Sequence, residues 1–177
     1  MSQELLKQAQ RLFAIQDVYI CDIKAHCQTD FEPRVPIEPL GIQTRISQNQ
    51  EAQYYCLASG NNRGHFLKYF IETGLRVLRP GIDAAGPVAD DQVLAEIVIT
   101  FIATYVIKNE EAPSEQLVNA FADNAIHHIW PYWREYVHST MIRFRLPPVM
   151  LPMRIAGRPK PGQGEQIAAT AIDSQQQ

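Results

Sequence analysis

Hydrophobic and polar residues alternate with a period of two along much of the first two thirds of the chain. Such alternation is typical of β-strands that bury one face. It predicts a strand from Asp17, long strands over His65–Leu78 and Val93–Ile107, and a shorter strand over Ala52–Ala58. Gly60–Gly64 reads as a turn, because its glycines and asparagines favour a reversal of the backbone. The chain is therefore expected to build a sheet of about four strands.

A long amphipathic helix is predicted after the last strand. Apolar residues recur there at three- and four-residue spacing from Ser114 to Leu146. Ser114 can cap the first turn with its hydroxyl, and Pro147 disfavours helical geometry at Leu146. Pro131 lies inside the stretch and lacks an amide hydrogen, so we expect a kink there rather than an end. The apolar stripe of this helix is expected to pack on one face of the sheet.

The two ends of the chain differ from this middle part. Residues 2–15 have helical spacing and predict a short amphipathic helix, which we place within residues 1–16. Phe31–Gly41 holds three prolines and is expected to be an extended connection. Residues 154–177 have no apolar period and are rich in glycine, proline and glutamine, which predicts a disordered tail. We therefore expect a single domain over residues 1–153.

The strand Val93–Ile107 is apolar on both faces. Every odd position is apolar, and most even positions are apolar as well. One layer of helix covers one face of a sheet, so the other face needs a second cover. Packing against a second subunit and contact with apolar segments of another chain both fit this pattern. The candidate residues for an oligomer interface are Val18, Ile20, Leu94, Val98, Ile102 and Val106.

Composition and charge narrow the classes of function. The formal net charge is -3 and the pI is about 5.9, which argues against a nucleic-acid partner held by a basic surface. The sequence shows neither a long apolar run nor a secretory leader, so we expect a cytoplasmic protein without membrane insertion. The three cysteines, Cys21, Cys27 and Cys56, are expected to be free thiols. Scattered histidines argue against a metal site, and no cofactor is expected.

Segments in two regions of the chain resemble a known family. Trp130–Glu135 reads WPYWRE and is followed by Leu146–Pro152, which reads LPPVMLP; near the N-terminus, Val18–Ile23 reads VYICDI. These segments are similar to the long-helix signature and the first strand of SecB and SecB-like chaperones. The resemblance implies an α+β fold, a SecB-like antiparallel sheet of about four strands with the long kinked helix packed on one face.

The same resemblance implies a function. SecB-like proteins are tetramers, built as dimers of dimers, whose grooves hold unfolded polypeptides without ATP. We therefore expect a holdase that binds unfolded or precursor polypeptides and associates with itself as a dimer or dimer of dimers, with the SecA translocase of protein export as a candidate partner. Methionine and aromatic side chains suit such contacts. The candidate client-binding residues are Tyr132, Trp133, Phe144, Leu146, Val149, Met150, Leu151 and Met153.

Departures from the family leave two alternatives open. Phe144-Arg145 stands where the family's long helix ends in glycine, and the tail is slightly basic, whereas many family members have an acidic tail that contacts SecA. Some SecB-like proteins guard one partner, such as an antitoxin, and this chain fits such a dedicated role. The other alternative is a structural protein that keeps the fold for assembly alone. An enzyme is not expected, because His127, His128 and His138 have no nucleophile or carboxylate at a useful spacing.

Overall fold

The computed structural model describes residues 3–31, 40–47, 51–59, 62–109 and 111–153. The predicted tail, residues 154–177, and most of the predicted proline-rich connection lie outside this part. The described elements, in chain order, are α1 (Gln3–Leu12), β1 (Phe13–Cys27), β2 (Gly41–Ile46), β3 (Glu51–Ser59), β4 (Asn62–Leu78), the short 3-10 helix η1 (Asp90–Gln92), β5 (Val93–Ile107) and α2 (Glu115–Arg143). They confirm the predicted α+β class.

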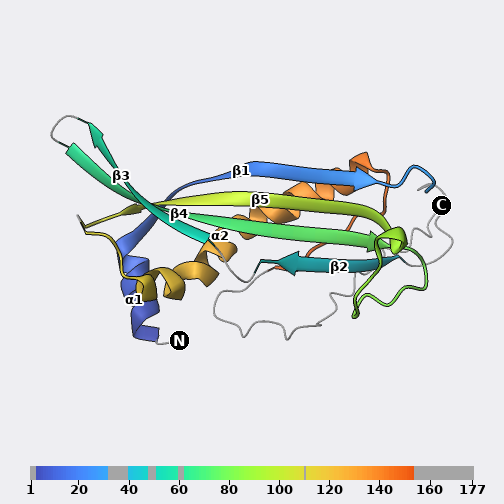
Figure 1. Ribbon diagram of the computed structural model, residues 1–177, viewed down its shortest axis with the longest axis horizontal. Helices are drawn as coiled ribbons and strands as arrows, with labels where there is room; N and C mark the ends of the chain where they lie inside the picture. Colours follow the sequence, from blue (N-terminus) through green and yellow to red (C-terminus); the bar gives the residue numbers. More distant parts are fainter. Residues whose placement is uncertain (1–2, 32–39, 48–50, 60–61, 110, 154–177) are drawn as a thin grey trace, which may run out of the picture. The chain divides into compact units, whose positions relative to one another are not determined.

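The strands form a sheet in the order β1-β5-β4-β2, and β3 also pairs with β4 (Figure 1). β3 and β4 are antiparallel, with Glu51 opposite Phe70 and Ser59 opposite Asn62. Just after β2, the amide of Ser47 donates a 2.8 Å hydrogen bond to the carbonyl of Glu72 in β4. β2 and β3 therefore lie one after the other along β4.

Most of the predicted elements are confirmed. β5 has the predicted bounds, β4 contains the predicted strand, and β3 contains the predicted short strand. The Ser114 hydroxyl accepts a 3.4 Å hydrogen bond from the amide of Leu117, and α2 continues through Pro131. The strands differ from the prediction at β4, which already begins at Asn62, inside the predicted turn. β2 was not predicted, because its six residues are too few to show a clear period.

The chain divides into two compact units. Unit 1 consists of Met1–Asp22, Ile46–Glu72 and Ile99–Trp130, and unit 2 consists of Ile23–Arg45, Thr73–Val98 and Pro131–Gln177. β1, β4, β5 and α2 each contribute residues to both units. Each unit has buried apolar side chains of its own.

The core of unit 1 is built around Phe121, in the first half of α2. The centroid of its ring lies 5.1 Å from that of Phe13, 5.0 Å from that of Tyr105 and 6.2 Å from that of Tyr69. The Tyr69 hydroxyl donates a 2.7 Å hydrogen bond to the carbonyl oxygen of Val118. Tyr69 and Tyr105 occupy odd positions of β4 and β5, so in this unit the odd-numbered face of the two strands carries α2.

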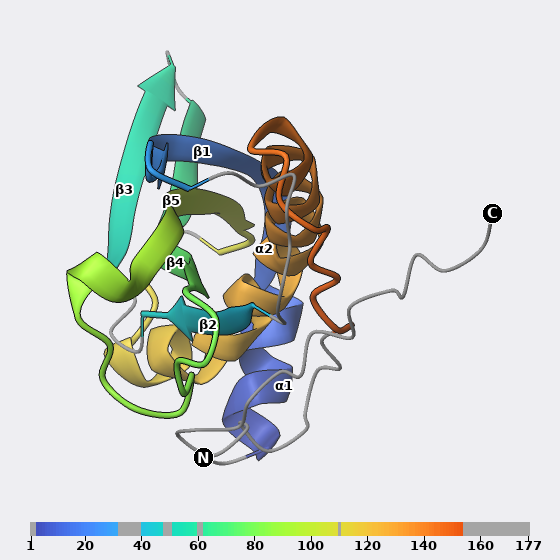
Figure 2. The same cartoon turned by 90° about the vertical axis from the view of Figure 1, so that its right-hand side faces the viewer.

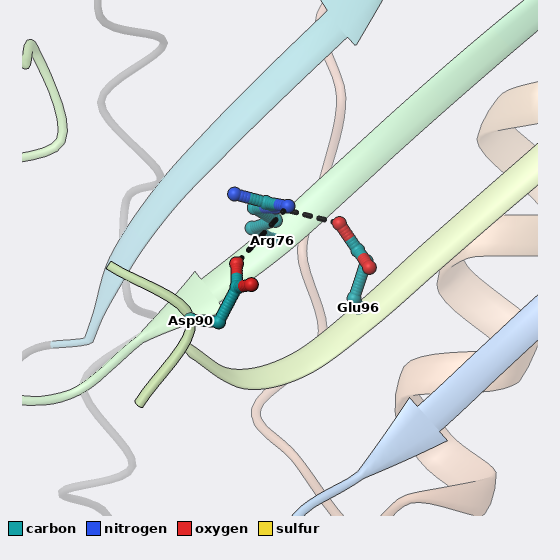
Figure 3. Close-up of polar contacts among 3 residues, drawn as sticks. All are labelled: Arg76, Asp90 and Glu96. Atoms are coloured by element: carbon teal, nitrogen blue, oxygen red, sulfur yellow. Dashed lines mark hydrogen bonds and ion pairs between the residues drawn. The ribbon is translucent and has the colours of Figure 1, made fainter. Parts of the chain in front are cut away.

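Unit 2 combines a buried helix face with a cross-strand ion pair. The second half of α2 contributes Trp133 and Val137, which are both buried. Arg76 of β4 donates from Nε to the Oε1 of Glu96 in β5 at 2.6 Å (Figure 3). Asp90 lies 3.7 Å from Arg76 but is almost fully exposed, so that contact adds little stability. These even positions of β4 and β5 therefore carry paired charges rather than an apolar surface.

Helix α1 is shorter than predicted. It ends at Leu12, and β1 begins at Phe13, four residues before the predicted start of the strand. The carbonyl oxygen of Leu12 accepts a 3.1 Å hydrogen bond from the amide of Lys108, at the end of β5. The Phe13 side chain is buried against Phe121. Pairing with β5 and burial of this ring outweigh the helical spacing of the local sequence.

Helix α2 ends at Arg143, three residues before the predicted end at Leu146. The amide of Leu146 donates to the carbonyl of Met141 at 3.0 Å, and the amide of Arg145 donates to the carbonyl of Ile142 at 3.0 Å. Arg145 has a φ of 59°, in the left-handed region. This is a Schellman motif, which satisfies the last free carbonyls of a helix and normally places glycine at the left-handed position.

Replacing Arg145 with glycine is expected to raise the free energy of unfolding by about 0.5–1 kcal/mol, because glycine adopts a positive φ without a clash of Cβ. The same substitution at Arg143, inside the last turn, is expected to lower it by about 1 kcal/mol. Urea denaturation followed by circular dichroism measures both values. A loss of stability in Arg145→Gly would contradict this account of the helix end.

Candidate functional site

The predicted client-binding residues divide by their exposure. Tyr132, Met150 and Met153 are 51%, 60% and 73% exposed, and Phe144 is partly exposed. The other four are buried, namely Trp133, Leu146, Val149 and Leu151. These four side chains belong to the core of the chain, which corrects the expectation that they are open to a client. The exposed methionines both lie in the exit segment, residues 144–153.

Contacts with α2 hold the exit segment in place and so set which of its side chains are exposed to solvent. The Nε of Arg134 donates a 2.7 Å hydrogen bond to the carbonyl oxygen of Leu151, and its Nη1 lies 2.6 Å from the Sδ of Met153. Val149 and Leu151 are buried, whereas Met150 between them is exposed. Successive side chains of an extended backbone point in opposite directions, so anchoring two of them leaves the one between them in solvent.

The predicted oligomer-interface residues also divide. Val18, Ile20 and Val106 are partly exposed, whereas Leu94, Val98 and Ile102 are buried within the single chain. Those three lie in β5, which is flanked by β1 and β4, so residues on neighbouring strands surround them. Much of the apolar surplus of β5 is therefore covered by the chain itself, which corrects the expectation that these three side chains need a second chain to cover them.

Exposed apolar side chains occur instead on the outer strands. None of these side chains was predicted as a site residue; they are Ile15, Tyr19 and Ile23 of β1 and Tyr54 and Leu57 of β3. β1 is at one end of the strand order, and β3 pairs only with β4 within the described residues. The alternation of β1 was visible in the sequence, but its place at an edge follows from the order of the strands.

A partly buried polar pair lies in unit 1. The Tyr105 hydroxyl is 2.8 Å from the Nδ1 of His128. Burial lowers the pKa of His128 below its usual value, and the neighbouring His127 lowers it further. Burial also raises the pKa of Tyr105, so its hydroxyl stays protonated and can donate to a neutral imidazole.

The depressed pKa of His128 predicts a loss of stability in acid. In the unfolded chain this histidine takes up a proton as the pH falls below about 6.5, whereas in the folded chain it stays neutral to a lower pH. The contribution of neutral His128 to the free energy of unfolding is therefore fully present above pH 6.5 and is lost as the pH falls through the pKa of the folded state. We expect the drop in urea midpoint between pH 7.5 and pH 5.5 to be smaller in His128→Asn than in the wild type. His138→Asn, at an exposed position, is the control. If the urea midpoint of His128→Asn falls as much as that of the wild type, His128 is not the source of the acid sensitivity.

Three further findings concern the described residues. No three His, Cys, Asp or Glu side chains among them lie close enough together to hold a metal ion. No helix among them is both long enough and apolar enough to cross a membrane. The three cysteines, Cys21, Cys27 and Cys56, are free, as expected, and burial raises the pKa of the Cys27 thiol.

An antiparallel sheet beside a long helix that continues through Pro131 into an anchored exit segment defines a class, the SecB-like chaperone fold. A solved structure with this fold is the Mycobacterium tuberculosis SecB-like chaperone Rv1957 in complex with a ChAD peptide from the Rv1956 HigA1 antitoxin. It is similar to this chain with a TM-score of 0.61 and 22% sequence identity, over 89% of this chain and 99% of that one. No protein-family model matches the sequence, and no curated protein matches it either. The SecB-like fold predicted from the sequence is thereby confirmed.

Proposed function

We propose that this chain is an ATP-independent holdase that binds apolar segments of non-native polypeptides. The observation that carries the proposal is the exposure of Met150 and Met153 beside the buried anchors Val149 and Leu151. Water disfavours exposed apolar side chains, and the anchors prevent these two from being withdrawn into the core. Flexible thioethers can adapt to many apolar partners.

Such binding requires neither a catalytic group nor a nucleotide. Apolar contact is reversible and reads little of the client's sequence, which suits a protein that holds many segments and releases them again. Tyr132, exposed on the same half of α2 that carries Arg134, offers an aromatic contact as well. The solved structure with the same fold holds a peptide, which supports a polypeptide as the kind of ligand.

We also propose that the chain associates with itself through β1. Ile15, Tyr19 and Ile23 are four residues apart and therefore share one face of this edge strand, and all three are exposed. A second copy that covers them would remove three large apolar side chains from water. Light scattering after size-exclusion chromatography tests the proposal: a mass of two or four chains supports it, and a monomer over micromolar concentrations rules it out.

The aggregation of a chemically denatured model protein tests the holdase proposal. The denatured protein is diluted into buffer with a stoichiometric amount of this chain and no nucleotide, and light scattering is followed. Suppressed scattering supports a general holdase. Scattering that proceeds unchanged removes that role.

A double variant tests the exposed methionines. Met150→Asp with Met153→Asp is expected to weaken binding of the denatured protein about thirtyfold, because two apolar contacts of roughly 1 kcal/mol each are replaced by charges that resist desolvation. His138→Asp adds an acidic residue at an exposed position of α2 and is expected to bind as the wild type does. Equal binding by the double variant would exclude the exit segment as the client site.

The breadth of the clientele separates the remaining roles. Suppression of aggregation for several unrelated proteins supports export-type clients, and SecA then becomes the partner to test by co-purification. Binding of a single peptide, such as one from an antitoxin, without general suppression supports a dedicated chaperone. If the chain binds neither denatured proteins nor such a peptide, a structural role for the fold is supported.

A further inference from the structure

The outer edge of β3 has no neighbouring strand in the described part of the chain. β3 pairs with β4 on one side, and no other helix or strand of unit 1 lies along its other side in either view (Figures 1 and 2). Alternate backbone groups of a strand point to each side, so this edge of nine residues presents about four N–H and four C=O groups to solvent. An edge of this kind is a template for a further strand.

After Glu51 at its start, the edge of β3 also lacks the usual protection by charge. Ala52–Ser59 contains no charged residue, and its sequence AQYYCLAS includes two adjacent tyrosines, which favour strands. The opposite edge strand, β1, carries Asp17, Asp22 and Lys24. Natural sheets use such charges to prevent another chain from pairing with an edge. Compared with β1, the outer edge of β3 therefore carries little charge that would prevent another strand from pairing with it.

Side-chain contacts hold β3 firmly on β4. The Tyr54 hydroxyl lies 2.6 Å from the Nδ1 of His65, which is buried. The rings of Tyr55 and Phe66 are stacked with centroids 5.2 Å apart, and the Nζ of Lys68 lies 4.9 Å from the centroid of the Tyr55 ring. A template that is already ordered costs less conformational entropy when it binds.

Both faces of β3 offer an apolar contact beside the open edge. Tyr54 and Leu57 are 40% and 58% exposed. They are three residues apart, so they lie on opposite faces of the strand. A strand added to this edge would meet an apolar side chain above and below the sheet.

We infer that the outer edge of β3 receives an extended segment of a non-native polypeptide as an additional strand. The inference rests on the holdase proposal and names a second contact region for the same clients. The partner is an uncharged, strand-forming segment whose backbone hydrogen bonds are unpaired. Recognition through backbone groups is independent of sequence, which non-native clients require. The exit segment then supplies apolar contacts, and β3 supplies hydrogen bonds.

The experiment uses the full chain and a labelled ten-residue peptide of alternating valine and threonine. A second peptide carries N-methyl groups on two adjacent central residues, which blocks hydrogen bonding at both of its edges while its side chains stay the same. The unmodified peptide is expected to bind at least about tenfold more tightly, because the N-methylated peptide cannot form several of the backbone hydrogen bonds. Equal affinities for the two peptides would overturn the inference.

Amide hydrogen exchange locates the bound peptide. Protection of Glu51–Ser59 on binding is the expected result. Protection confined to residues 149–153 would overturn the inference while the holdase proposal stands. No peptide binding together with no suppression of aggregation would remove both. Protection of β3 that rises with the concentration of the chain alone would assign the edge to a second copy and also overturn the inference.

A matched pair of variants provides an independent readout. Leu57→Lys places a charge beside the open edge, at a residue that is 58% exposed and lies opposite Gly64. It is expected to weaken binding of the unmodified peptide at least fivefold. Ile142→Lys makes a comparable apolar-to-lysine change at a residue of α2 that is 57% exposed, and is expected to leave binding unchanged. Equal effects of the two variants would contradict a site on β3.

Discussion

Trp133→Ala is expected to lower the free energy of unfolding by about 3–5 kcal/mol. Trp133 is 0% exposed in unit 2, so alanine would leave a cavity about the size of the indole ring and remove the contacts that the ring makes. The loss is measured by urea denaturation followed by far-ultraviolet circular dichroism, which does not depend on the fluorescence of the deleted tryptophan.

Tyr132 is the natural control for this experiment. It precedes Trp133 on α2 but is half exposed, and Tyr132→Ala is expected to cost less than about 1 kcal/mol. The pair also bears on function, because the proposal assigns Tyr132 to the surface and Trp133 to the core. Similar losses for the two variants would mean that this half of α2 does not pack as described.

Phe121→Ala is expected to have an effect of the same size in unit 1. The Phe121 ring is 2% exposed and lies within about 5 Å of the rings of both Phe13 and Tyr105, centroid to centroid. Its removal would create a cavity where α2, β1 and β5 meet, and we expect a loss of about 3–5 kcal/mol. Exchange of the backbone amides of α1, next to Phe13, is expected to accelerate in this variant.

Phe121→Leu separates lost volume from lost ring contacts. Leucine retains most of the buried apolar area but not the edge-to-face geometry, so a loss of about 1–1.5 kcal/mol is expected. A wild-type-like stability for Phe121→Ala would show that the site collapses without cost. That result would contradict the description of Phe121 as the centre of unit 1.

The residues that carry the candidate surface were only partly visible in the sequence. The exit segment was predicted as a client site because of the resemblance to SecB-like chaperones and its apolar side chains, methionines among them. Its exposed methionines remain candidates. Trp133 and Leu151 were predicted for the same site, although both are buried. The spacing of apolar residues shows which of them share a face of a helix or strand. It does not show whether another segment of the folded chain covers that face.

The backbone at the end of α2 gives a second example. The sequence correctly indicated that the helix stops near its prolines, yet the stop comes at Arg143, through a left-handed Arg145. Arginine gives no signal for that conformation, which glycine usually supplies. Buried contacts of Met141 and Leu146, together with the two closing hydrogen bonds, offset the strain at Arg145.

By itself, the sequence determined the long strands, the long helix through Pro131 and the resemblance to SecB-like chaperones. Each of these depends on residues close together in the chain, whose spacing sets the period of a helix or a strand. The tertiary structure alone decided that β1 and β3 are outer strands, that Leu94 is covered and that Met150 is not. Exposure to water depends on neighbours that folding brings from distant parts of the sequence, and no local pattern contains that information.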